Sequence, residues 1–343
     1  MAAQKGPDAH KLDPLLADPD ADRPQMFPGA SPEMLSGSSD MTVKLWDLKS
    51  GECTRTLVGH KGPVLSLAVD WHEQRALSGS GDYMVFQWDV RNKVWQGQFE
   101  GHTGAVSAVS ADWDNGRVLS GSYDHTLRLW ELQGRTCSRV HEGHTGPIVD
   151  AAADWKGGRF ISGSQDQTVK LWDVETGSCV QTMVGHTGPV WAVAVDAAGQ
   201  QAVSGSCDRH LMRWDLRSGT CVKAMLQHQR SVSVLSVDWV AMQAMSGSGD
   251  RTLILWDLDD GRPISKYDKH PGSIWSLDVD WQGRRMLSGA GPGDKAMRLW
   301  DFSDGYCANE IFGHMSTIFA ISADWETAHR AVAESQGIGI TDG

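Results

Sequence analysis

Histidine, serine and aspartate recur together at regular spacing, and these residue types form the catalytic triad of serine hydrolases. In each set a serine follows the histidine by eighteen residues, and an aspartate and a tryptophan follow the serine. Six sets lie in order along the chain: His60/Ser78/Asp82/Trp88, His102/Ser120/Asp124/Trp130, His144/Ser162/Asp166/Trp172, His186/Ser204/Asp208/Trp214, His228/Ser246/Asp250/Trp256 and His270/Ser288/Asp294/Trp300. A seventh set, His314/Ser36/Asp40/Trp46, would combine the two ends of the chain. Because an enzyme needs one such site, seven copies favour a repeated structural role.

The sets belong to an internal repeat that is marked most clearly by tryptophan. The 343 residues include 16 tryptophans, which outnumber the 4 tyrosines and 7 phenylalanines together. Tryptophan is followed by an acidic residue at Trp46, Trp88, Trp130, Trp172, Trp214, Trp256 and Trp300, with five intervals of 42 residues and a last one of 44. Gly-His and Ser-Gly-Ser markers keep the same step, and the two extra residues lie in the turn at 290–294. Such a period indicates a repeat architecture.

These markers make the chain similar to the WD40-repeat family from residue 35 to about residue 325. A period near 40–45 residues with Gly-His and Trp-Asp markers is typical of the four-stranded blades of a β-propeller. The resemblance implies that each His, Ser, Asp and Trp set is a hydrogen-bonded tetrad. Each tetrad would join the loop before the inner strand of a blade to the strand that carries the tryptophan.

Each repeat unit also reads as four short strands. In the second unit, residues 64–69 are apolar almost throughout, as expected for an inner strand buried on both faces. Residues 75–80 and 84–88 follow after turns, and residues 94–99 alternate in polarity as an outer strand should. One four-stranded sheet cannot bury both faces alone, so neighbouring blades must stack and the ring must close. The sequence therefore predicts an all-β, seven-bladed propeller with four antiparallel strands per blade.

The closing blade is predicted to combine both ends of the chain. Inner strands are expected to start at Val64, Val106, Ile148, Val190, Val232, Ile274 and Ile318. The first repeat unit lacks an inner strand and the last has one without a Trp-Asp pair, so residues 316–323 should pair with residues 34–58. Residues 330–335 resemble a degenerate second strand, which leaves open whether residues 329–341 compete with residues 33–38 for the closing blade. The N-terminal segment matches the repeat better and is favoured. An incomplete eighth blade is the alternative.

The composition and charge of the chain indicate what lies outside the repeats and which partners and compartments are excluded. Residues 1–33 hold six of the 12 prolines and show no strand pattern, which predicts a disordered leader before a propeller over residues 34–335 and a tail over residues 336–343. The formal charge of −12 argues against direct nucleic-acid binding. No apolar run is long enough to span a membrane, and the first residues lack the apolar core of a signal peptide. We therefore expect a monomeric protein of the cytoplasm or nucleus that does not bind a membrane.

Other candidate chemistry finds little support. Five of the six cysteines, Cys53, Cys137, Cys179, Cys221 and Cys307, occupy equivalent outer-strand positions, and we expect them to be packed in a reducing compartment. The sequence contains no zinc-ligand spacing, phosphate loop, dinucleotide fingerprint or nucleophile elbow. Six Asp-Trp pairs, such as Asp70-Trp71, end the inner strands, and their tryptophans should pack between blades or cover the turn. We expect no metal, no cofactor and no catalysis.

The positions that vary between repeats are the better candidates for function. In the WD40 family, the second residue of each inner strand usually points into the mouth of the central channel. Here these residues are Leu65, Ser107, Val149, Trp191, Ser233, Trp275 and Phe319, with Tyr123 on the same face. Apolar clusters of this kind typically mark an interaction site, although they could also simply plug the channel. We predict docking of a protein or peptide whose basic or apolar side chain enters the channel, with a basic peptide favoured by the acidic charge.

A second candidate surface lies on the opposite face. The segments that end in Arg91 and Arg217 read Trp-Asp-x-Arg, a pattern by which some WD40 proteins dock on the adaptor of a cullin-RING ubiquitin ligase. The other interpretation is a surface arginine at the end of a strand. The sequence therefore predicts a non-catalytic interaction scaffold, with a substrate receptor of a cullin-RING ligase as the alternative.

Overall fold

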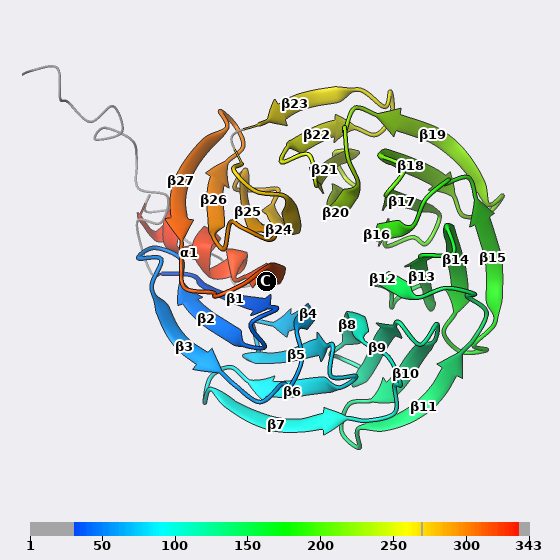
Figure 1. The fold of residues 1–343 in the computed structure, drawn as a ribbon, viewed down its shortest axis with the longest axis horizontal. Helices are drawn as coiled ribbons and strands as arrows, with labels where there is room; N and C mark the ends of the chain where they lie inside the picture. The colour runs from blue at the N-terminus through cyan, green and yellow to red at the C-terminus, as the bar shows by residue number, and fades with distance from the viewer. Residues whose placement is uncertain (1–30, 269, 336–343) are drawn as a thin grey trace, which may run out of the picture.

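The computed structural model describes residues 31–268 and 270–335, which form a ring of four-stranded antiparallel sheets around a central channel (Figure 1). These residues contain 28 strands in seven sheets and one helix. We number the blades from the first sheet that is continuous in sequence. In each blade the first strand named below lines the channel and the last lies on the outer rim.

Blades 1 to 4 follow one another along the chain. Blade 1 consists of β4 (Val64–Asp70), β5 (Arg75–Ser80), β6 (Val85–Asp89) and β7 (Val94–Phe99). Blade 2 consists of β8 (Val106–Asp112), β9 (Arg117–Ser122), β10 (Leu127–Glu131) and β11 (Thr136–His141). Blade 3 consists of β12 (Ile148–Asp154), β13 (Arg159–Ser164), β14 (Thr168–Asp173) and β15 (Cys179–Val184). Blade 4 consists of β16 (Val190–Val195), β17 (Gln201–Ser206), β18 (His210–Asp215) and β19 (Thr220–Leu226).

Blades 5 to 7 complete the ring. Blade 5 consists of β20 (Val232–Asp238), β21 (Gln243–Ser248), β22 (Leu253–Asp257) and β23 (Pro263–Tyr267). Blade 6 consists of β24 (Ile274–Asp280), β25 (Arg285–Ala290), β26 (Met297–Asp301) and β27 (Tyr306–Ile311). Blade 7 consists of β28 (Ile318–Ala323), β1 (Glu33–Ser38), β2 (Val43–Asp47) and β3 (Cys53–Leu57). All seven inner strands start at the residues predicted from the sequence.

The hydrophobic core lies between the blades rather than within any one of them. Each of seven clusters of buried residues joins two neighbouring sheets. Between blades 1 and 2, for example, Val85 and Phe99 pack with Val106 and Trp130. The tryptophans of all seven Trp-acid pairs are at most 2% exposed. Stacking of blades therefore buries the apolar faces, as the repeat pattern predicted.

Blade 7 confirms that the two ends of the chain share one sheet. β1 pairs antiparallel with β28, with Met34 opposite Ala323 and Ser36 opposite Ile321. On its other side β1 pairs with β2, so β28 supplies the inner strand and the N-terminal region supplies the other three. β1 begins at Glu33, one residue before the predicted boundary. The expected leader lies almost entirely outside the described residues, and the expected tail at 336–343 lies outside them too.

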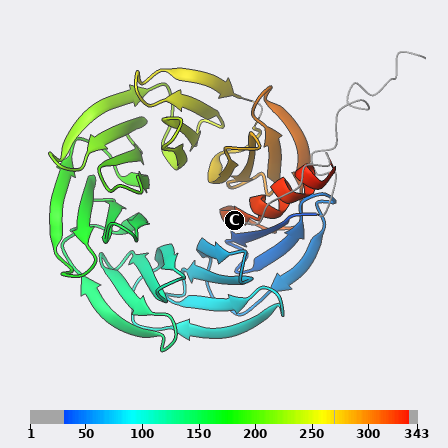
Figure 2. The same ribbon diagram turned by 180° about the vertical axis from the view of Figure 1, so that it is seen from behind.

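The favoured pairing of the N-terminal segment with β28 is confirmed, whereas residues 330–335 do not form the strand that they resemble and there is no incomplete eighth blade among the described residues. These residues belong to α1 (Trp325–Ser335), which lies at the junction of blades 6 and 7 (Figure 2). The carboxylate of Asp324 accepts the backbone N–H of Thr327 at 3.0 Å and so caps the helix start. The alanine-rich sequence favours a helix, and β1 already occupies the position beside β28.

The tryptophans of the Asp-Trp pairs contact the preceding blade, as expected from the sequence. In four pairs the indole N–H donates a hydrogen bond to a residue near the middle of the preceding inner strand. The pairs are Trp71 with Ser322 at 3.2 Å, Trp155 with Ser110 at 3.2 Å, Trp281 with Ser236 at 3.3 Å and Trp325 with Asp278 at 3.1 Å. These bonds link neighbouring blades close to the channel.

The expectation that the outer-strand cysteines are packed is wrong for four of the five. Cys53, Cys137, Cys179 and Cys221 are exposed on the rim, and Cys307 is partly buried. The outermost strand has no further strand beyond it, so alternate side chains project into solvent. The part of the chain that the structure describes contains no helix long and apolar enough to cross a membrane.

Candidate functional site

The two faces of the ring are defined by different turns. On the mouth face, the loop before each inner strand meets the turn between the second and third strands. In blade 1 this contact is a hydrogen bond of 2.7 Å from the amide of Gly81 to the carbonyl of Pro63. On the opposite face, the turn after the inner strand meets the turn after the third strand. There the amide of Val90 donates to the carbonyl of Gln74 at 2.8 Å.

A cavity of about 470 Å³ lies at the mouth end of the channel. Its wall is built from the beginnings of the seven inner strands, which surround the centre of the ring in Figure 1. The cavity wall includes all eight residues that the sequence placed at the mouth: Leu65, Ser107, Tyr123, Val149, Trp191, Ser233, Trp275 and Phe319. Of these Val149 is buried and the others are partly or largely accessible. The volume suits a few side chains of a partner, since ligand pockets typically measure about 300–1,000 Å³.

Three aromatic side chains form a continuous section of this wall. The rings of Trp191 and Trp275 meet edge to face with centroids 5.8 Å apart, and Trp275 meets Phe319 in the same way at 5.6 Å. Trp191 donates its indole N–H to the Cys207 sulfur at 2.7 Å. The indole nitrogen of Trp275 is buried and has no hydrogen-bond partner among the described residues. Edge-to-face contacts fix the rings, so the wall is preorganised.

The polar groups of the cavity are largely committed to the scaffold. The hydroxyl of Ser107 donates to the carbonyl of Ile148 at 2.6 Å, and Ser233 donates in the same way to the carbonyl of Ile274. These bonds satisfy carbonyls on the free edges of the next inner strands. The hydroxyl of Ser66 is the exception, because it is buried without a hydrogen-bond partner among the described residues.

Asp150 adds one acidic group that the sequence prediction did not single out. It lines the cavity, and its two carboxylate oxygens accept the backbone N–H groups of Ala151 at 2.9 Å and Val193 at 2.8 Å. Burial raises the pKa of Asp150 to about 6, because the backbone hydrogen bonds offset only part of the desolvation. The corresponding residues of the other blades are serine, alanine or valine, so alignment of the repeats would have revealed it.

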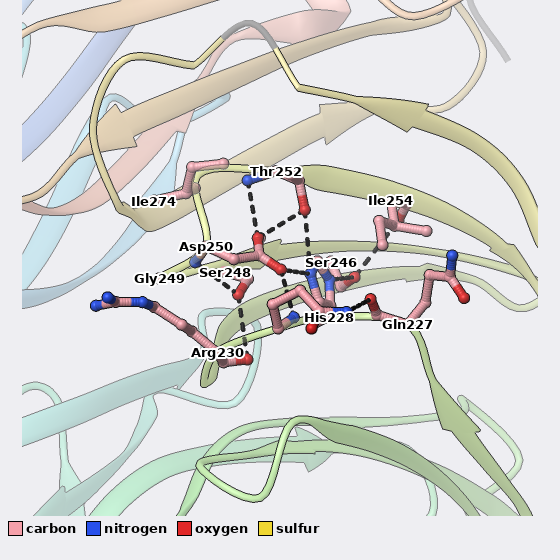
Figure 3. A network of polar contacts seen from close by, with 12 residues as sticks. Gln227, His228, Arg230, Ser246, Ser248, Gly249, Asp250, Thr252, Ile254 and Ile274 are labelled. Atoms are coloured by element: carbon pink, nitrogen blue, oxygen red, sulfur yellow. Dashed lines mark hydrogen bonds and ion pairs between the residues drawn. The ribbon is translucent and has the colours of Figure 1, made fainter.

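The predicted tetrads are continuous hydrogen-bond chains in six blades. In blade 5, shown in Figure 3, the Nδ1 of His228 contacts the Asp250 carboxylate at 3.0 Å and the Nε2 contacts the Ser246 hydroxyl at 2.7 Å. The same hydroxyl oxygen accepts the indole N–H of Trp256 at 2.8 Å. This geometry fits a histidine that carries its proton on Nδ1 and accepts the serine proton at Nε2.

Blades 1 to 4 and blade 7 have the same connections. The histidine–serine distance is 2.7 Å in each, and the histidine–aspartate distance ranges from 2.6 to 2.8 Å. The bridging serines of these five blades are all 0% exposed, and in ring order from blade 7 they are Ser36, Ser78, Ser120, Ser162 and Ser204.

Burial of these serines decides between the two interpretations of the repeated residue set. A substrate or ligand cannot reach a hydroxyl that is fully buried, so the serines are not accessible functional sites. This rules out the hydrolase interpretation that the residue types alone invite. Each hydroxyl is instead occupied by a histidine and a tryptophan, as in the pairs of Ser78 with Trp88 and Ser162 with Trp172, both 2.8 Å long. The geometry supports a structural role.

The aspartates of the tetrads remain ionised. For Asp124 burial alone would raise the pKa, but hydrogen bonds from His102, Thr126 and the amide of Thr103 together hold the pKa well below its usual range. The same balance lowers the pKa of Asp40, Asp166 and Asp250. Each turn is thereby fixed to the loop that precedes the inner strand.

The prediction of a complete tetrad is wrong for blade 6. Trp300 donates to Ser288 at 2.8 Å, but the His270 ring is turned so that Nδ1 contacts the carbonyl of Gly272 at 2.8 Å. Its Nε2 is buried without a partner among the described residues. Asp294 lies 4.0 Å from His270 and instead pairs with Arg298 at 2.7 Å. Burial, together with the charge of Arg298, lowers the pKa of His270 to about 4.

Arg91 and Arg217 of the two Trp-Asp-x-Arg segments are exposed on the opposite face. The preceding aspartates cap their own turns, since Asp89 accepts the amide of Asn92 at 2.7 Å and Asp215 accepts that of Ser218 at 2.8 Å. The two arginines belong to blades 1 and 4 and so lie on different sides of the ring. Among the described residues, no group of three or more histidine, cysteine or acidic side chains is arranged to hold a metal ion.

A family model for the WD domain, G-beta repeat, matches residues 24–47, 51–89, 94–131, 135–173, 177–215, 219–257 and 261–301. The chain belongs to the WD-repeat family. The seven matches correspond to the seven Trp-acid units, the first of which contributes to blade 7. Proteins of this family are generally non-catalytic scaffolds for protein interactions.

Curated relatives are similar to single repeats of this chain. A stretch of 43 residues is 46% identical to the lissencephaly-1 homolog of Branchiostoma floridae and covers 12% of this chain and 10% of that protein. A stretch of 46 residues is 48% identical to mitochondrial division protein 1 of Chaetomium globosum (13% and 6%). A stretch of 41 residues is 49% identical to the human F-box-like/WD repeat-containing protein TBL1Y (12% and 8%). These matches span a tenth or less of each relative's length.

Proposed function

We propose that this protein is a non-catalytic platform that docks a protein or peptide partner over the mouth face, with one partner side chain in the cavity. The observation that carries this proposal is the cavity wall formed by Tyr123, Trp191, Trp275 and Phe319. Aromatic anchors in a concave, mostly apolar site are typical of interface hot spots. Side chains that merely plugged the channel would not leave a cavity of about 470 Å³ beside them.

The side chain that enters the cavity is proposed to be basic or apolar. The accessible faces of Trp191 and Tyr123 can contact a cation or an aliphatic chain equally well. At neutral pH the carboxylate of Asp150 is mostly ionised, because the pKa of about 6 lies below 7. This charge on the cavity wall favours a lysine or arginine of the partner, and the net charge of −12 supports its approach.

The first experiment removes the aromatic wall. We expect Trp191→Ala and Trp275→Ala, alone and together, to weaken partner binding by about 2 kcal/mol or more, which is about thirtyfold in affinity. The measurement is recovery of co-purifying proteins by quantitative mass spectrometry. Trp95→Ala is the matched control, because Trp95 is 51% exposed on outer strand β7. Unchanged recovery with the double variant would rule out the cavity as the docking site.

The second experiment tests the acidic group. Affinity for a lysine-rich or arginine-rich partner segment should fall as the pH drops from 7 to 5, because Asp150 becomes protonated below its pKa of about 6. Asp150→Asn should bind more weakly at pH 7 and lose this part of the pH dependence. An equal pH dependence in the variant would exclude Asp150 as the cause. Isothermal titration with the partner recovered in the first experiment provides the measurement.

A receptor of a cullin-RING ubiquitin ligase is the second candidate function. It is supported by Arg91 and Arg217, which are exposed on the opposite face and could contact an adaptor while the mouth face holds a substrate. Affinity purification should then recover the adaptor with the wild-type protein and lose it with Arg91→Ala/Arg217→Ala. Purification of the wild-type protein without any such adaptor would eliminate this candidate.

The proposal also includes the cellular compartment and the oligomeric state of the protein. The six cysteines are free, and four are exposed, which fits the reducing environment of the cytoplasm or nucleus. We infer a monomeric propeller that acts without bound cofactor, nucleic acid or membrane. Sedimentation of the purified protein and microscopy of a tagged chain would test the oligomeric state and the compartment.

A further inference from the structure

The residue after the turn aspartate occupies the same place on the mouth face of six blades, and in blade 6 it follows the longer turn. Six of these residues adopt a left-handed backbone, with φ between 68° and 75°, although none is glycine or asparagine. In ring order from blade 7 these six are Met41, Tyr83, His125, Gln167, Arg209 and Arg251, and Lys295 is the corresponding residue in the longer turn of blade 6. The shared backbone conformation does not require any of these side chains, because it favours glycine. Their chemistry nevertheless changes by sector, from apolar in blades 7 and 1 to basic in blades 4 to 6.

Arg230 enlarges the basic sector. Five blades have glycine at its position, where Gly62 and its equivalents pass close to the neighbouring turn backbone. In blade 5 the arginine side chain instead runs past Gly249, and Figure 3 shows it extending away from the hydrogen-bond network. The sulfur of Cys207 and the hydroxyl of Ser231 are 3.3 Å apart, which brings the turn that carries Arg209 next to the loop that carries Arg230.

The cations of this sector are available for a ligand. Arg209, Arg230, Arg251 and Lys295 are exposed, and within the described part of the chain their side chains form no ion pair or hydrogen bond. The neighbouring acids Asp208 and Asp250 are 6% and 7% exposed and are held by histidines and backbone amides. Asp268, the exposed acid at the end of blade 5, lies beyond outer strand β23. A local excess of positive charge therefore borders the wall that carries Trp191.

We propose that Arg209, Arg230 and Arg251 bind an acidic segment of the protein partner. The inference rests on the proposed function, since it assigns a second contact to the same docked partner. Three guanidinium groups can each bind a carboxylate in a bidentate arrangement, and their spread over two blades fits an extended chain better than a single ion. The apolar residues Met41 and Tyr83 lie across the ring in blades 7 and 1, so the segment contacts the basic side alone.

The test uses fluorescein-labelled hexaglutamate as the probe and fluorescence anisotropy as the measurement. We expect Arg209→Glu/Arg230→Glu/Arg251→Glu to weaken binding of hexaglutamate about tenfold, with a steep salt dependence in the wild type. Lys49→Glu/Arg55→Glu/Lys156→Glu is the matched control. It makes the same change in net charge at exposed residues away from the mouth face, in the turn after β2, in β3 and in the turn after β12.

Three results would overturn the proposal. The first is failure of the wild type to bind hexaglutamate, and the second is equal loss of binding in both triple variants. The third is tighter binding of a labelled single-stranded oligonucleotide that is lost in the mouth-face variant, since this would assign the sector to nucleic acid. Trp191→Ala/Trp275→Ala separates the two proposals. If this variant keeps its partner while the triple arginine variant loses hexaglutamate, the cavity proposal fails and the basic sector stands.

Discussion

Blades 6 and 7 differ in a way that the course of the chain would not suggest. Blade 7 is assembled from segments that are more than 270 residues apart in sequence, yet its tetrad is complete, with His314 and Ser36 2.7 Å apart. Blade 6 is continuous in sequence, yet His270 does not contact Ser288 and its Nδ1 faces the carbonyl of Gly272. Continuity of the chain therefore does not decide whether the tetrad forms. The tetrad depends instead on the length of the turn that carries its aspartate and on the residues beside that turn.

Two local features account for the difference. The turn at 290–294 in blade 6 is two residues longer than its equivalents and displaces Asp294 relative to the loop that carries His270. Arg298 is 3% exposed, and its guanidinium pairs with Asp294 at 2.7 Å and with Glu310 at 2.9 Å. A buried cation needs a carboxylate partner more strongly than a neutral imidazole does. Blade 2 has Arg128 at the position of Arg298 and keeps its tetrad, so the arginine holds Asp294 away from His270 only in combination with the longer turn.

The largest expected effect comes from breaking blade 7. Deletion of residues 310–343 removes β28 and leaves β1 without its inner neighbour, so we expect cooperative unfolding to be lost. Truncation after Asp324 is the control, because it keeps β28 and His314 and removes α1. This shorter truncation should still unfold cooperatively. Calorimetry on both variants is the measurement, and an unchanged transition in the larger deletion would contradict closure by β28.

The second-largest effect is expected from replacing the bridging serine of blade 7, Ser36, and its smaller counterpart from replacing that of blade 6, Ser288. Ser36→Ala should leave both the indole N–H of Trp46 and the Nε2 of His314 buried and unpaired, at a cost of about 2–4 kcal/mol. Ser288→Ala removes only the acceptor of Trp300, so it should cost about 1–2 kcal/mol. Urea unfolding of the two variants gives the comparison. Equal losses would mean that the missing contact to His270 has no energetic consequence.

The propeller could be predicted from the sequence because the same strand pattern occurs seven times along the chain. The inner strands and the closing pair follow from register within that pattern, and the cavity residues follow from the position that usually faces the channel in the WD40 family. What could not be predicted depends on departures from it. The helix after Trp325 forms because β1 already covers β28, and the His270 rotation depends on a buried arginine whose orientation no spacing reveals. Asp150 and the basic sector were visible in the repeats but required comparison position by position.

A smaller effect concerns pH. The pKa of His270 is about 4 in the folded chain, whereas an ordinary histidine has a pKa of 6.5. At a pH between these two values, His270 is therefore protonated in the unfolded chain and neutral in the folded chain. The stability that neutral His270 contributes is complete above pH 6.5 and is lost as the pH falls toward 4, on the order of 3 kcal/mol in total. Asp150 and Asp278, with pKa values raised to about 6, act in the opposite direction because stability from them falls as pH rises from 3.8 to 6.

The His270 contribution is isolated by comparison with His270→Gln, which does not titrate. The difference in unfolding free energy between wild type and variant should shrink on going from pH 7 to pH 4, since both proteins share Asp150, Asp278 and the buried His141. Urea unfolding at several pH values measures this difference. A difference that is the same throughout the range would show that His270 is not held neutral in the folded chain.

The smallest effect should come from repairing blade 6. Deletion of Pro292 and Gly293 restores the 42-residue spacing, and Arg298→Lys releases Asp294, since Lys44 and Lys170 at the same position contact threonines instead. We expect the combined variant to turn His270 toward Ser288 and Asp294 and to gain about 0.5–1.5 kcal/mol per hydrogen bond formed, less the loss of the arginine ion pairs. Nitrogen chemical shifts of the imidazole report the rotation, and the pKa of His270 should rise from about 4. If the ring rotates in the deletion variant but not in Arg298→Lys, turn length is the cause. If it rotates in Arg298→Lys but not in the deletion variant, the ion pair is the cause. If it rotates in neither of these variants nor in the combined variant, both explanations are wrong.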